Sequence, residues 1–117
     1  MKVNKTRIFA EITGQQAVVH FISTHVRELS DAQRISDEVE EIAYNNRINL
    51  VVINFSRLKQ MTSSFLGRLI ALQKSLKQAG IELRLCAMSS NVEKAYKICK
   101  LEKVIPLYKS EQKALEG

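Results

Sequence analysis

Apolar residues recur along the chain at different spacings, and each spacing predicts one kind of element. Residues 8–13 and 17–22 are short β-prone runs on either side of Gly14-Gln15-Gln16, which predicts an antiparallel hairpin. Residues 50–55 are apolar at every position except Asn54, as in a strand that is covered on both faces. We therefore expect this run at the centre of a sheet.

Two segments carry apolar residues at intervals of three and four, the spacing of one face of a helix. In the first, Ser30 and Gln33 resemble a capping box, so a helix is expected from Ser30 to about Asn45. In the second, a helix is expected from Ser63 until Gly80 stops it. The apolar positions are Ile35, Val39, Ile42 and Ala43 in the first segment and Phe65, Leu69, Leu72, Leu76 and Ala79 in the second.

The last third of the chain continues this alternation. A strand is expected over residues 81–87, a helix from Ser90 or Asn91 to about Lys100, a short strand over residues 104–107 and helical turns over residues 110–115. Alternating strands and helices imply a parallel sheet, which here follows an antiparallel hairpin. The predicted fold is α/β, a mixed sheet with about four helices, in a single domain over residues 1–117.

Composition limits the function classes. With 117 residues, 45% of them hydrophobic, the chain is too short for a catalytic domain with a separate substrate domain. No signal peptide and no apolar run of membrane-spanning length occur, so a cytoplasmic protein is expected. Cys86 and Cys99 are expected to be buried free thiols. Of the net charge of +6, an excess of five lies in residues 61–117, where we expect the partner surface.

Residue patterns typical of catalysis are absent. His20 lies in a predicted strand and His25 in the next loop, with no spaced Cys, His or carboxylate cluster that would bind a metal. The four glycines are too scattered for a phosphate-binding loop, and no Ser or Cys lies in a nucleophile elbow. We expect no enzyme activity, no metal and no cofactor.

Three hydroxyl side chains crowd the start of the second predicted helix, directly after the central strand. They are Thr62, Ser63 and Ser64. One interpretation is that Thr62 or Ser63 merely caps the helix, since both residue types are favoured there. The other is a functional site, because sites in open α/β sheets form beyond the carboxyl ends of parallel strands, where a helix N-terminus offers free amides.

Residues 51–67 read Val-Val-Ile-Asn-Phe-Ser-Arg-Leu-Lys-Gln-Met-Thr-Ser-Ser-Phe-Leu-Gly and are followed by a long helix, Gly80 and a strand. Ser89-Ser90-Asn91-Val92 then begins a helix that leads to Leu101-Glu102-Lys103-Val104. Over about residues 8–116 this pattern resembles the STAS domain of bacterial anti-sigma factor antagonists. In that family the turn usually reads Asp-Ser-Ser/Thr-Gly-Leu-Gly, and a partner anti-sigma factor kinase phosphorylates the first Ser.

The resemblance implies a protein-binding switch. Ser63 corresponds to the phosphorylated residue, and Ser64 and Thr62 are weaker candidates. Two residues depart from the pattern: Thr62 replaces the usual Asp, although it can still cap the helix, and Phe65 replaces the first Gly and is expected mainly to pack in the core. The expected partner is an anti-sigma factor serine kinase, with a serine phosphatase as a further candidate. The expected contact residues are Thr62, Ser63, Ser64, Phe65, Gly67 and Arg68, in a monomer or weak dimer with no membrane insertion.

Two other classes stay open. Similar domains serve as scaffold subunits of stress-signalling assemblies, where a bulkier residue often follows the Ser, and as partners of lipid-transport ATPases. A nucleic-acid-binding module is a weaker alternative, because lysines recur every third residue on a predicted helix and beyond it but few aromatic residues are available for stacking. Those lysines are Lys94, Lys97, Lys100 and Lys103.

Overall fold

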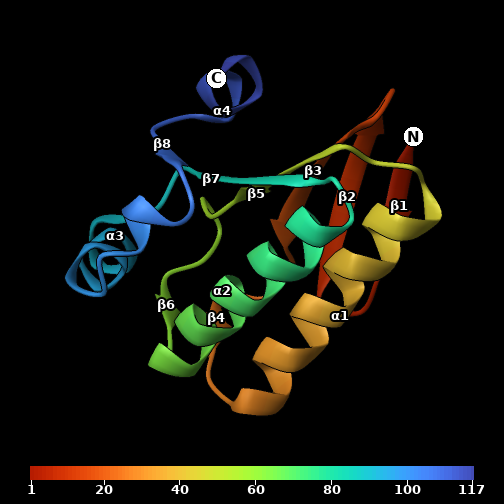
Figure 1. Cartoon of the computed structure of the whole chain (residues 1–117). Helices are drawn as coiled ribbons and strands as arrows, with labels where there is room; N and C mark the ends of the chain where they lie inside the picture. Colours follow the sequence, from red (N-terminus) through yellow and green to blue (C-terminus); the bar gives the residue numbers. More distant parts are fainter.

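A six-stranded sheet forms the middle of the computed structural model, which describes residues 1–117 (Figure 1). The first three strands in the sheet pair antiparallel, and the remaining strands add in parallel. This arrangement confirms the predicted mixed sheet. In spatial order the strands are β1 (Lys2–Asn4), β2 (Ile8–Thr13), β3 (Gln16–Phe21), β5 (Leu50–Asn54), β7 (Glu82–Cys86) and β8 (Leu107–Tyr108).

Four α-helices surround the sheet, as predicted. The two long helices lie side by side along one face, and the last helix lies on the other side (Figure 1). A second, two-stranded parallel sheet connects the loop after β3 with the loop after β5. The elements are α1 (Leu29–Asn45), α2 (Ser63–Gln78), α3 (Ser90–Ile98), α4 (Glu111–Glu116), the 3-10 helix η1 (Leu101–Lys103), and the short strands β4 (His25–Val26) and β6 (Gln60–Met61).

The central strand β5 is buried along its whole length, as its apolar sequence predicts. Val51 and Ile53 belong to the main core beneath α1 and α2. Leu50 and Val52 belong to a smaller core that Ala114 of α4 closes from the opposite side. Because β5 is covered on both faces, its carboxyl end and the turn that follows it are anchored in the most buried part of the molecule.

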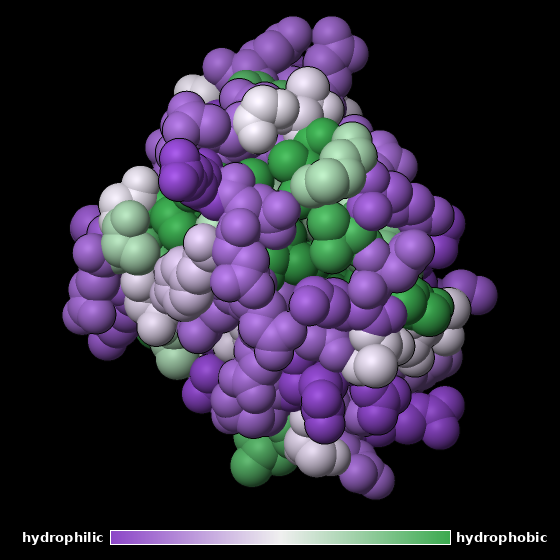
Figure 2. All heavy atoms as spheres, turned by 90° about the vertical axis from the view of Figure 1, so that its right-hand side faces the viewer, coloured by the Kyte–Doolittle hydropathy of each residue, from purple (hydrophilic) through white to green (hydrophobic).

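The edge strand β1 was not predicted. Met1 and Ile12 exchange backbone hydrogen bonds of 3.0 and 2.8 Å, which attach the N-terminus to β2. The buried carboxylate of Glu38 in α1 accepts hydrogen bonds from the backbone amides of Thr6 and Arg7, at 3.2 and 2.8 Å. Contacts between distant parts of the chain therefore fix this strand and its turn. Figure 2 looks towards the side of the molecule where β1 and α1 lie; polar side chains cover most of it and frame an apolar area.

The predicted capping box of α1 is wrong. The helix begins at Leu29, and no side chain caps it. Ser30 Oγ instead donates to the Glu28 carboxylate, and the Gln33 amide donates to Asp37. Two further expectations also need correction: Ser89, rather than Ser90 or Asn91, caps α3 by accepting from the Val92 amide, and Cys99 is exposed.

The strand expected over residues 104–107 is displaced to Leu107–Tyr108. The buried hydroxyl of Tyr96 contacts the carbonyl oxygens of Leu101, at 3.1 Å, and Ile105. These contacts hold the chain after α3 in a compact turn that includes η1, so hydrogen bonding with β7 starts at the Pro106 carbonyl, which accepts from the Leu85 amide at 3.0 Å. None of the helices combines the length and apolar character needed to cross a membrane.

Candidate functional site

The turn between β5 and α2 is fixed by hydrogen bonds at its beginning. The side-chain oxygen of Asn54 accepts a 2.8 Å hydrogen bond from the amide of Ser56, which forms an Asx-type turn. The Leu58 amide then donates to the Phe55 carbonyl at 2.9 Å. Asn54 also donates to the carboxylate of Glu111 at 3.0 Å, on the α4 side of the sheet. The one polar residue of the central strand therefore orients the chain that leads to the site.

The second half of this turn is held by the loop after β3. His25 pairs with Gln60 and Val26 with Met61, and the Thr62 amide donates to the Val26 carbonyl at 3.2 Å. The sequence suggested only a polar stretch here, in which the apolar Val26 is the one signal of a buried contact. In the structure Val26 is 2% exposed. The start of α2 is thus fixed from both sides.

Thr62 occupies the N-cap position of α2 but does not cap it through its side chain. Its backbone is extended, with φ −83° and ψ 161°, as the N-cap position requires. Its hydroxyl oxygen is buried and has no hydrogen-bond partner. The expectation that Thr62 or Ser63 serves as a side-chain cap is therefore wrong: Ser63 is the first helical residue, and no side chain caps the first turn.

Ser63 and Ser64 are both exposed at this helix N-terminus. Backbone amides without helical partners and the helix dipole make such a position favourable for a negatively charged group. Gly67 is exposed one turn further along, and a Cβ placed on it would meet no atom within 4 Å. The start of α2 is therefore an exposed surface that bears hydroxyl groups, and no side chain projects from it at Gly67.

Two of the expected contact residues point elsewhere. Phe65 is only 1% exposed, and its ring packs 5.9 Å from Phe21 and 6.4 Å from Phe55, measured between ring centroids. Its expected packing in the core is confirmed, and the expectation of a direct partner contact is corrected. Arg68, also expected to contact a partner, is half-buried, and its Nη2 donates to Ser36 Oγ of α1 at 3.2 Å.

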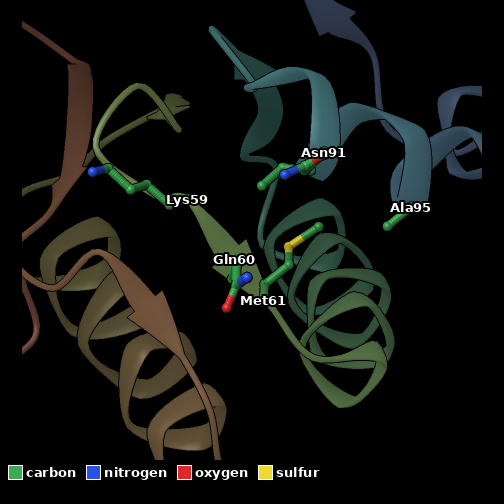
Figure 3. A pocket seen from close by; sticks show the side chains of 6 residues that line it. Lys59, Gln60, Met61, Asn91 and Ala95 are labelled. Atoms are coloured by element: carbon green, nitrogen blue, oxygen red, sulfur yellow. The ribbon is translucent and has the colours of Figure 1, made fainter.

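A hollow of about 310 Å³ lies beside the site, between β6 and α3. Lys59, Gln60 and Met61 contribute one side, and Asn91, Val92 and Ala95 the other. In Figure 3 the side chain of Met61 extends towards α3, whereas those of Lys59 and Gln60 point away from it. The sequence did not predict this hollow, because the pairing of β4 with β6 determines where Met61 stands relative to α3.

The histidines take part in local contacts. The His20 ring stacks on Phe9, 4.9 Å between centroids, and its Nε2 lies 3.9 Å from Glu111. His25 Nδ1 lies 2.7 Å from the hydroxyl of Thr24. No group of three or more His, Cys, Asp or Glu side chains is placed to hold a metal ion. Both histidines are therefore accounted for by contacts within the fold.

Comparison with known proteins supports this description of the fold. The family model for the STAS domain matches residues 9–114. An anti-sigma-factor antagonist (STAS) domain protein from Planctomyces limnophilus shares 21% identity, over 97% of this chain and 98% of that one, with a TM-score of 0.77. The anti-sigma factor antagonist SpoIIAA, in its unphosphorylated form, shares 18% identity over 93% of each chain, with a TM-score of 0.75.

The fold is also shared more widely. The phosphorylated form of Bacillus SpoIIAA matches with a TM-score of 0.68 at 17% identity, over 93% of this chain and 96% of that one. A sulfate transporter family protein from Wolinella succinogenes matches with a TM-score of 0.72 at 14% identity, over 91% of this chain and 86% of that one. These likenesses show a common fold, and the family model covers most of the sequence. The chain therefore belongs to the STAS domain family.

Proposed function

We propose that this STAS domain is an anti-sigma factor antagonist that works by partner switching in the cytoplasm. It binds a serine-kinase anti-sigma factor while Ser63 is unmodified, and it releases that partner once Ser63 is phosphorylated. In this way the domain controls a sigma factor, and hence transcription, through protein binding alone and without enzyme activity of its own. The names of the solved relatives, among them a protein solved in both phosphorylated and unphosphorylated forms, support this class of function.

The observation that carries the proposal is the position of Ser63. It is exposed, it is the first residue of α2, and the turn before it is fixed by β4. Phosphorylation would add about −1.5 to −2 charge, which the amides and dipole of a helix N-terminus stabilise. The modified domain is therefore expected to stay folded, so that release of the partner results from a changed surface.

The surroundings of Ser63 supply a docking surface of suitable form. Gly67 leaves room for close approach of a partner, and the hollow next to Met61 can accept a partner side chain. Arg27 follows the paired residue Val26 directly, and the Val26 carbonyl binds the Thr62 amide. A cationic side chain is thus attached to the backbone next to the switch, where it can pair with a carboxylate of the partner or with the phosphate.

Affinity capture from the native host tests the proposal. Wild type and Ser63→Ala should retain a protein with a kinase domain, and Ser63→Asp should lose it, as identified by mass spectrometry. Ser64→Asp is the matched control, because it adds the same charge one residue further along the helix. Equal retention by all four baits would exclude the switch at Ser63, and loss with Ser64→Asp alone would move the acceptor to Ser64.

Captured proteins also separate the alternative functions. Other STAS subunits in a particle much larger than a dimer would indicate a scaffold of a stress-signalling assembly. A transport ATPase retained equally by wild type and Ser63→Asp would indicate an accessory subunit. In either case the antagonist proposal fails while the assignment to the STAS family remains.

A further inference from the structure

Helix α3 turns a basic and aliphatic face to the solvent. Val92 and Tyr96 are its buried residues, and the opposite side displays Lys94, Lys97 and Ile98. Ile98 is 80% exposed, more than any other large apolar side chain of the protein. An aliphatic side chain thus protrudes between lysines on this side of α3.

The same features continue after the helix ends. Lys100 and Lys103 are exposed, and Val104 is 44% exposed. The only ion pair here joins Lys97 to Glu93, at 3.1 Å, so the other lysines are free to interact with a partner. We call this region the α3 surface, defined by Lys94, Lys97, Ile98, Lys100, Lys103 and Val104.

Lys100 has an unfavourable backbone conformation for its residue type. Its φ of 56° and ψ of 31° lie in the left-handed region, which glycine adopts most readily and which commonly ends a helix. The Lys100 side chain is exposed at this turn, so its charge adds to those of the neighbouring lysines.

The composition of the α3 surface indicates the class of its partner. From residue 85 to the end of the chain every basic residue is a lysine, and no aromatic side chain belongs to the α3 surface. Protein interfaces are enriched in arginine and aromatic residues and depleted in lysine. Binding of single-stranded nucleic acid relies on aromatic stacking platforms. Lysine charges around an exposed aliphatic side chain suit anionic lipid headgroups above a hydrocarbon interior.

We infer that the α3 surface binds the anionic face of a lipid bilayer peripherally, with Ile98 inserted among the headgroups and the lysines paired with lipid phosphates. The contact is reversible and does not involve a membrane-spanning segment. It does not depend on the partner switch, because none of its six residues belongs to the start of α2.

Sedimentation with vesicles tests this inference. The full chain should bind vesicles of phosphatidylglycerol mixed with phosphatidylcholine and should not bind phosphatidylcholine alone. The double variant Lys94→Glu and Lys103→Glu should weaken binding at least about tenfold, since each basic residue near such a surface contributes several-fold to affinity. Lys74→Glu with Lys77→Glu is the matched control: both lysines are exposed on α2, and the net charge changes equally.

The apolar contribution has its own controls. Ile98→Ser should reduce vesicle binding, whereas Leu29→Ser, at a side chain that is 62% exposed on α1, should leave it unchanged. The chain has no tryptophan, so Ile98→Trp introduces a single fluorophore. Its emission should shift to the blue with phosphatidylglycerol vesicles and stay unchanged with phosphatidylcholine. Circular dichroism verifies that each variant is folded.

Several results would overturn the inference. Wild type would bind both kinds of vesicle equally or bind neither, or the control variants would lose as much binding as the test variants. The fourth is a sedimenting Ile98→Trp variant whose tryptophan emission shows no blue shift. Duplex DNA that competes through these lysines, while vesicles do not bind, would instead assign the surface to nucleic acid. High salt should weaken binding both to phosphatidylglycerol vesicles and to DNA.

Discussion

Arg68 Nη2 donates a hydrogen bond of 3.2 Å to Ser36 Oγ, and this contact connects the helix that carries Ser63 to α1. Ser36 is 1% exposed, on a helix whose Ile35 and Val39 belong to the main core. The Nε of Arg68 is buried without a partner. The two helices thus share a polar contact that is only partly satisfied, one turn beyond the proposed switch.

Because Arg68 Nε has no partner, substitutions of Ser36 and of Arg68 should lower the free energy of unfolding by different amounts. Ser36→Ala leaves the guanidinium without its acceptor and should lower the free energy of unfolding by about 1–2 kcal/mol. Arg68→Met removes the charge and the unpaired Nε and fills similar space, so it should cost less. Urea unfolding of both variants measures the difference. Ser75→Ala, at a half-buried serine of α2, is the control and should have little effect.

Phe65 replaces a glycine of the family pattern and has become part of the aromatic core. Phe65→Ala should lower the free energy of unfolding by about 3–5 kcal/mol, because the cavity left beside Phe21 and Phe55 cannot close completely. Phe65→Leu should cost less, since it keeps most of the apolar volume. Thermal and urea denaturation decide this. A loss of less than about 1 kcal/mol for the alanine variant would contradict the assigned packing.

Regular apolar spacing made much of the fold predictable. The continuous apolar run predicted that β5 is buried on both faces, and all five of its residues are buried. The spacing of three and four predicted that α2 is buried on one face, which carries Phe65, Leu69, Leu72 and Leu76. The position of Ser63 at the start of α2 followed from the same stripe together with the hydroxyl-rich turn. Long elements are predictable in this way because their apolar pattern repeats several times.

Short elements were not predictable, because contacts with distant residues create them. β4 and β6 have two residues each, and the pairing of Val26 with Met61 appears only once the loops after β3 and β5 meet. The same reason accounts for β8, whose start depends on the contact of Tyr96 with Ile105. At Thr62, the favoured capping residue occupies the cap position while its hydroxyl is turned inwards.

The two cysteines should differ sharply in reactivity. Cys86 is fully buried, and burial, followed by the charge of Glu111, raises the pKa of its thiol to about 11. Cys99 is exposed. A thiol reagent at mildly alkaline pH should therefore modify one thiol of the folded chain, and Cys99→Ser should abolish the rapid reaction. Rapid modification of both thiols in folded wild type would show that Cys86 is accessible.

The raised pKa of Cys86 also sets a direction for stability against pH. Above the ordinary value of 9.0 the unfolded thiol loses its proton, while the folded thiol keeps it until about pH 11. The folded state then binds more protons, so the free energy of unfolding falls as the pH rises through this range. Cys86→Ala should lessen that fall, as urea midpoints on either side of the range measure. An equally steep fall in the variant would assign it to other groups, such as Tyr96, whose pKa burial also raises.

Thr62 stands where the family pattern has Asp, and the structure predicts what restoring the acid would do. The helix N-terminus has no side-chain cap, and the Thr62 hydroxyl has no partner. In Thr62→Asp, a carboxylate turned towards the first-turn amides should accept a hydrogen bond and interact favourably with the helix dipole. The free energy of unfolding should rise by about 0.5–1 kcal/mol near neutral pH. The gain should disappear as the pH falls below the pKa of the carboxyl group.

The same substitution separates capping from recognition. Thr62→Asn is the matched control, because its amide oxygen can cap the helix without a charge. If a kinase partner reads the carboxylate, Thr62→Asp should be phosphorylated at Ser63 faster than wild type, and Thr62→Asn should not. If both variants gain equally, the cap speeds the reaction by ordering the first turn of α2. If neither gains, the partner of this protein recognises Ser63 without an acidic neighbour, and surface residues such as Arg27 become the next candidates for that contact.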